Sequence, residues 1–73
     1  DIDLYNDDDD KSRQIQMLYD RISRLEPFDR AIILLWLENM TYEDIAGIMG
    51  ISLANVTTRL FRIKEQLKSM SNV

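Results

Sequence analysis

The stretch "GISLANVTTRLFRIK", residues 50–64, decides how this chain folds. Gly50 is a common helix-ending residue, and Ser52 is a favourable N-cap for a new helix. The apolar residues that follow recur at helical spacing: Leu53, Val56, Leu60, Ile63 and Leu67. A tight glycine-containing turn that leads into such a helix is typical of the helix-turn-helix. What remains open is whether this is a generic helical hairpin or a helix built for the major groove of DNA.

Three further helices are predicted ahead of this turn. Residues 12–25 carry Ile15, Leu18, Ile22 and Leu25 at helical spacing. Pro27 suits the first turn of a second helix, because its missing N–H costs nothing there. The body of that helix, "FDRAIILLWLEN", is apolar on nearly every side and is expected to be the most buried, with Asn39 just beyond its end.

The third helix begins at Thr41 in "TYED", where Thr41 can cap and Asp44 takes the capping-box position. Its buried stripe is Tyr42, Ile45, Ala46 and Met49. Gly47 is expected to allow close packing against a neighbouring helix. The fourth helix runs from Ser52, its cap, to about Ser69. The sequence therefore predicts an all-α, small four-helix domain with a C-terminal helix-turn-helix of the winged-helix-like kind.

The composition excludes most enzyme classes. The chain has 73 residues, enough for one small domain, and contains neither cysteine nor histidine. Disulfides, thiolate metal sites and the commonest general base are therefore absent. The carboxylates clustered in the folded part, Glu38, Glu43 and Asp44, lie at predicted helix ends, where capping and dipole roles explain them. We expect no catalytic, cofactor-binding or metal site and no membrane insertion.

Charge is distributed unevenly along the chain. Residues 1–10 hold six aspartates and no base, whereas the remainder holds nine bases against seven acids. Residues 1–11 are predicted to be a disordered acidic linker, and residues 12–73 the folded domain. The letters "DDDDK" also match a protease site used in expression tags, so a tag remnant is the alternative; a chain that begins at Asp1 is expected to be a fragment.

The outward face of the last helix is unusual for a solvated surface. At 100° per residue it carries Ala54, Asn55, Thr58, Phe61, Arg62 and Glu65, with Thr57 and Arg59 on its flanks. Arginine, asparagine and threonine side chains suit base edges and phosphates. Phe61 is either an exposed contact or part of the core. The N-terminus of the third helix, with the Thr41 hydroxyl, is a further predicted phosphate contact.

At this point the sequence resembles region 4 of bacterial sigma factors, specifically the extracytoplasmic-function (ECF) type. The resemblance rests on an ordered set of segments: Leu25–Pro27, Ala31–Glu38, Tyr42–Ala46, Gly50–Ser52 and Val56–Arg62. It implies a cytoplasmic domain that binds the upstream (minus-35) promoter element through its last helix. Its partners would be promoter DNA, the β flap of the RNA polymerase core and possible anti-sigma factors.

By position, Thr57, Thr58, Phe61 and Arg62 match residues that contact DNA in this family, with Arg59 close to the backbone. The predicted DNA-binding residues are therefore Thr41, Asn55, Thr57, Thr58, Arg59, Phe61 and Arg62. Many relatives carry Lys or Arg where Thr57 stands, which implies weaker binding here. Two alternatives stay open: the output domain of a response regulator, and a protein-interaction module that uses the apolar second helix and Trp36.

Overall fold

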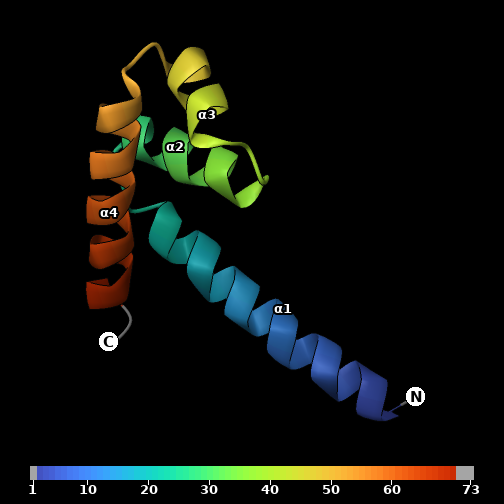
Figure 1. Cartoon of the computed structure of the whole chain (residues 1–73). Coiled ribbons are helices and arrows are strands. Elements are labelled where there is room, and N and C mark those ends of the chain that lie inside the picture. The colour runs from blue at the N-terminus through green and yellow to red at the C-terminus, as the bar shows by residue number, and fades with distance from the viewer. Residues whose placement is uncertain (1, 71–73) are drawn as a thin grey trace.

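The computed structural model describes the backbone of residues 2–70 and the side chains of residues 11–70. Within that range the chain forms four helices and no strand: α1 (Ile2–Ile22), α2 (Pro27–Leu37), α3 (Tyr42–Met49) and α4 (Leu53–Ser69). Figure 1 shows α2, α3 and α4 packed together, while α1 runs diagonally away from them. The predicted all-α fold with a C-terminal helix-turn-helix is confirmed.

The core lies where α2, α3 and α4 meet the C-terminal end of α1. Its buried members are all aliphatic: Ile22, Leu25, Ile32, Ile33, Ile45, Val56, Leu60 and Ile63. Among the described side chains no polar or charged one is buried. Apolar burial, worth about 1.5–3 kcal/mol for each such side chain, therefore holds the helices together. In α2 only Pro27 and Phe28 are exposed, whereas most residues of the longer α4 are exposed, so the prediction that α2 is the central, most buried helix is confirmed.

The two helices of the helix-turn-helix begin and end at the residues that the sequence predicted. The Thr41 hydroxyl accepts a hydrogen bond from the Asp44 amide at 3.0 Å, and the Ser52 hydroxyl accepts one from the Asn55 amide at 3.1 Å. Gly50 ends α3 in the left-handed conformation, at φ 72°. These caps satisfy amides that the helix itself leaves without partners.

Helix α2 is bounded in the same local way. It begins at Pro27, and its C-cap is Glu38. Asn39 follows with φ 66°, in the left-handed region that asparagine tolerates better than most residues. The predicted position of Asn39 just past the helix is therefore confirmed.

Helix α1 differs from its prediction at both ends. It begins at Ile2 rather than Ser12 and ends at Ile22 rather than Leu25. The backbone of residues 2–11 is thus helical where the sequence predicted a disordered segment, and residue 1 lies outside the described residues. Extending a formed helix needs no new nucleus, and acidic residues near a helix N-terminus interact favourably with its dipole. Both effects favour helix over this acidic block.

Three residues pack less closely than their sequence patterns indicate. Ile15 is 53% exposed, and Figure 1 shows that most of α1 projects beyond the other helices. Leu53 is 47% exposed, because it opens α4 and lies at the end of the helix rather than along its packed length. A Cβ atom added to Gly47 would meet nothing within 4 Å, so no close approach requires this glycine.

Candidate nucleic-acid interface

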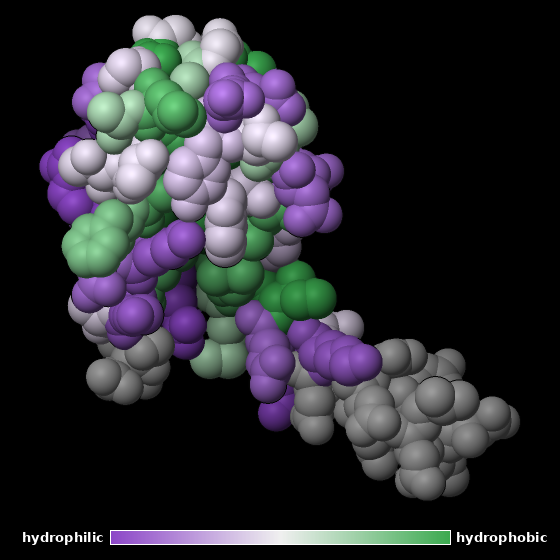
Figure 2. All heavy atoms as spheres, in the orientation of Figure 1, coloured by the Kyte–Doolittle hydropathy of each residue, from purple (hydrophilic) through white to green (hydrophobic). Residues whose placement is uncertain are grey.

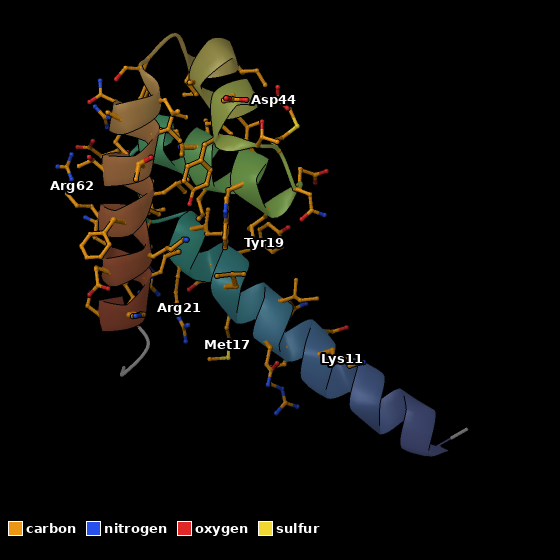
Figure 3. The ribbon with its side chains drawn as sticks, viewed as in Figure 1. Lys11, Met17, Tyr19, Arg21, Asp44 and Arg62 are labelled. Carbon is orange, nitrogen blue, oxygen red and sulfur yellow. The ribbon has the colours of Figure 1, made fainter. Side chains whose placement is uncertain are left out.

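One side of α4 is buried and the opposite side is open to solvent. Val56, Leu60 and Ile63 face the core. The exposed residues include five of the predicted contacts: Asn55, Thr57, Thr58, Phe61 and Arg62. Figure 3 shows Arg62 projecting from α4 away from the other helices. The structure therefore brings these five candidates together on one helix that projects them into solvent.

Fewer basic side chains of α4 are free to contact DNA than the sequence indicates. Three of its four bases are engaged: Arg59 with Asp29 at 3.1 Å, Lys64 over the Trp36 ring at 4.2 Å, and Lys68 with Glu65 at 3.5 Å. For Arg62 no hydrogen bond, ion pair or ring contact is found within residues 11–70. The first turn of α4 also contains no acid. Arg62 is thus the cation on α4 that is ready to meet a base or a phosphate.

Arg59 lies in a different setting from the other candidates. Its Nη1 atom donates to Oδ1 of Asp29 at 3.1 Å, and its guanidinium carbon lies 4.7 Å from the centroid of the Phe28 ring. The Arg59 side chain is 36% exposed and that of Asp29 only 18%. Arg59 therefore connects α4 to α2. Sequence reasoning missed this contact, because Asp29 lies 30 residues away and no local pattern links the two.

Phe61 is an exposed aromatic residue on an otherwise polar side of the helix. It is 66% exposed, which makes it the most exposed of the large hydrophobic residues described. The alternative that Phe61 packs in the core is thereby excluded. An exposed ring has a hydration cost that burial against another surface would remove, and its apolar edge can contact the methyl group of thymine.

The small polar residues of this surface keep hydrogen-bonding capacity. The Thr57 hydroxyl donates to the Leu53 carbonyl at 3.1 Å, which uses its proton but leaves its oxygen able to accept. The Asn55 side-chain amide and the Thr58 hydroxyl have no partner in the described part of the chain. These groups can form hydrogen bonds with base edges without breaking bonds within the protein.

Thr41 stands apart from the α4 candidates, at the N-terminus of α3. Its hydroxyl already caps the helix through the Asp44 amide. Glu43 and Asp44, both exposed, place two negative charges in the same first turn. Figure 3 shows Asp44 on α3, well away from Arg62. These carboxylates oppose a phosphate at this N-terminus, so the anion-binding tendency of the helix is weakened here.

Hydrophobic surface is exposed in more than one part of the molecule. Figure 2 shows it where α1 meets the other helices and again at the end where α3 and α4 join, with hydrophilic residues along the edge formed by α4 and elsewhere. The exposed apolar residues on α1 are Ile15, Met17 and Tyr19. No helix in the described range is long and apolar enough to cross a membrane. The α4 surface is thus mainly polar with Phe61 as an exposed aromatic residue, whereas the exposed apolar residues of α1 lie close together in the sequence.

Comparison with known families agrees with this arrangement. The chain matches the family model described as sigma-70, region 4, over residues 15–67, which is well over half of its length. No curated protein and no solved structure matches the chain significantly. Region 4 of these factors is a DNA-binding domain that takes part in promoter recognition with RNA polymerase. The matched span runs from α1 through α2 and α3 into α4, and on this basis the chain belongs to the sigma-70 region 4 family.

Proposed function

We propose that this domain recognises the upstream (minus-35) promoter element for an ECF-type sigma factor, with α4 lying in the major groove. The observation that carries this proposal is the solvent-facing side of α4. It combines unpaired hydrogen-bonding groups, an exposed aromatic ring and Arg62, a cation without a partner within residues 11–70. Arginine, asparagine and threonine are the side chains whose hydrogen-bonding groups suit base edges in the major groove.

The spacing of these residues sets the size of the element that they can read. Asn55, Thr58 and Arg62 recur at intervals of three and four residues, so they align along one helix face. The rise from residue 55 to residue 62 is about 10 Å, which corresponds to roughly three base steps of 3.4 Å. Arg62 pairs best with guanine and Asn55 with adenine. Direct readout by α4 is therefore confined to a short motif.

The remainder of the surface supports a role within the transcription complex. The exposed residues Ile15, Met17 and Tyr19 give α1 an apolar surface that a protein partner would cover. We assign this surface to docking on the β flap of RNA polymerase in the cytoplasm, where an anti-sigma factor would compete for it. Since α4 has a single cation without a partner among the described residues, affinity for DNA depends on this docking.

The proposal is tested by replacing Arg62 with alanine in the complete sigma–polymerase complex. Discrimination between upstream-element variants is expected to fall by about 1–3 kcal/mol at one or two base pairs, because a bidentate contact to one base is lost. Footprinting across a panel of single-base variants measures the effect. Arg13→Ala is the matched control, because Arg13 is an exposed arginine on α1, far along the chain from α4. Unchanged base preference in the Arg62 variant would rule out base reading by this face.

A gain of affinity is expected from Thr57→Arg. Thr57 is exposed, and its only hydrogen bond in the described range is to a carbonyl of its own helix, so the exchange disturbs no contact between helices. An added phosphate contact should strengthen binding about three- to tenfold at low salt and steepen the slope of log K against log salt by about 0.9. Titration at several salt concentrations measures both quantities. A higher affinity without a steeper slope would contradict a phosphate contact at this position.

A further inference from the structure

We propose that Arg59 is a positioning residue for DNA recognition. Held by Asp29 and Phe28 of α2, it fixes the rotation at which α4 presents its outer face to the groove. This inference rests on the proposed function, because it concerns how the same face is aimed. It also gives Arg59 a different part from the backbone contact that the family resemblance implies.

The geometry distinguishes this contact from the rest of the α4 packing. Val56, Leu60 and Ile63 attach α4 to the core through aliphatic burial, which is not directional. The guanidinium of Arg59 adds two directional restraints, the bond of 3.1 Å to Asp29 and the ring contact of 4.7 Å with Phe28. A planar guanidinium that is held by a carboxylate and an aromatic ring has little freedom to turn. Aliphatic packing thus buries one side of α4, and Arg59 adds a directional restraint on its rotation.

A small rotation of α4 produces a large displacement of the side chains that contact DNA. Side chains reach about 5–6 Å from a helix axis, so a rotation of 10° moves their tips by about 1 Å. A hydrogen bond tolerates about half of that displacement, since its usual range is 2.7–3.2 Å. Arg62 lies three residues after Arg59, on the next turn of the same helix. Loss of the Asp29 contact therefore weakens readout by Arg62 without removing any DNA contact.

The charge arrangement separates positioning from direct binding. The carboxylate of Asp29 neutralises Arg59, and both side chains line a surface depression of about 260 Å³ together with Arg62, Glu65 and Gln66. A basic side chain that is paired inside the protein releases no counterion from DNA when the complex forms. A basic side chain that contacts a phosphate releases one, and contributes about 0.9 to the slope of log K against log salt. The salt slope thus tells the two roles apart.

Four variants are measured in the sigma–polymerase complex on promoter DNA. They are Arg59→Ala, Asp29→Asn, the double variant that combines these two substitutions, and Arg62→Ala for comparison. For Arg59→Ala and Asp29→Asn we expect about a three- to tenfold loss of affinity for the preferred element and weaker base discrimination. In Arg59→Ala the salt slope stays unchanged. The double variant should bind no more weakly than the worse single one, because the two residues act through each other. A slope that falls by about 0.9 in Arg59→Ala, or fully additive losses, would overturn the inference.

Two further measurements keep the result interpretable. Phe28→Leu keeps an apolar side chain but removes the ring beneath Arg59, and is expected to weaken base discrimination in the same direction. Circular dichroism shows whether each variant keeps its helices, so that a folding defect is recognised. If every variant of Arg59, Asp29 and Phe28 unfolds, the contact serves stability and the positioning role fails. Arg62→Ala distinguishes the two proposals. If it leaves base preference unchanged, the proposed function fails; if it alone changes preference, only the role of Arg59 fails.

Discussion

Replacing Ile45 by alanine is expected to remove about 2–5 kcal/mol from the free energy of unfolding. Ile45 is fully buried, at 0% exposure, and it is the buried residue of α3. Truncation leaves a cavity between the two helices of the helix-turn-helix, which relaxes only in part. At about 0.05–0.15 kcal/mol per residue, a chain of this length has a total stability of roughly 4–11 kcal/mol. The variant is therefore expected to lose a large fraction of its stability, and with it the presentation of α4.

Ile48→Ala is the matched control for this prediction. It is the same substitution, one helical turn further along α3, but Ile48 is 57% exposed. Its removal should change stability by no more than about 0.5 kcal/mol. Urea denaturation followed by circular dichroism measures both variants, and Trp36 fluorescence gives a second probe. Equal losses at the two positions would show that α3 does not pack on the core through Ile45.

The boundaries of α2, α3 and α4 were predictable because local chemistry determines them. Thr41 and Ser52 cap helices through bonds to amides three residues away, and Gly50 and Asn39 take left-handed backbone conformations within two residues of a helix end. Each signal lies within a few residues of its effect. No knowledge of tertiary packing was needed to predict where α2, α3 and α4 begin and end.

The exposure of particular residues was less predictable, because periodicity shows which residues share a face and not how far a neighbouring helix extends. Ile15 and Leu53 belong to apolar stripes, yet each lies beyond the region that its neighbours cover. The helical start of α1 was missed for a related reason. Its acidic composition favours disorder when taken alone, whereas continuity with residues 12–22 favours helix.

Some features of the candidate site were also predictable from local sequence, and others depend on the tertiary structure. The exposed positions of Asn55, Thr58 and Arg62 followed from a helical wheel alone. The contact of Arg59 with Asp29 joins two helices that are separated by the whole of α3, and nothing in the sequence near either residue indicates it. Which surface of a helix faces solvent is a local property, whereas which surface charges are already neutralised is a property of the tertiary structure.

The two glycines of the helix-turn-helix should respond to substitution with opposite signs. Gly50 has φ 72°, and the amides of Gly50 and Ile51 both donate to the Ala46 carbonyl, which closes the end of α3. A β-branched side chain is strongly disfavoured in this conformation, so Gly50→Val should destabilise the domain by about 2–3 kcal/mol. Gly47 lies within α3 with open space around it, so Gly47→Ala should stabilise the domain by about 0.5–1 kcal/mol.

Gly50→Asn should have an intermediate effect, because asparagine enters the left-handed region more readily than other residues with side chains. Its urea midpoint of unfolding is expected to lie between those of the wild type and Gly50→Val. A Cβ atom at position 50 would meet nothing within 4 Å beyond its chain neighbours, so the first side-chain atom makes no tertiary clash. The loss is therefore expected to come mainly from the left-handed backbone conformation. If Gly50→Val matched the wild type in stability, the left-handed turn would not be needed to join α3 to α4, and the angle between the two helices would have to be set by their packing alone.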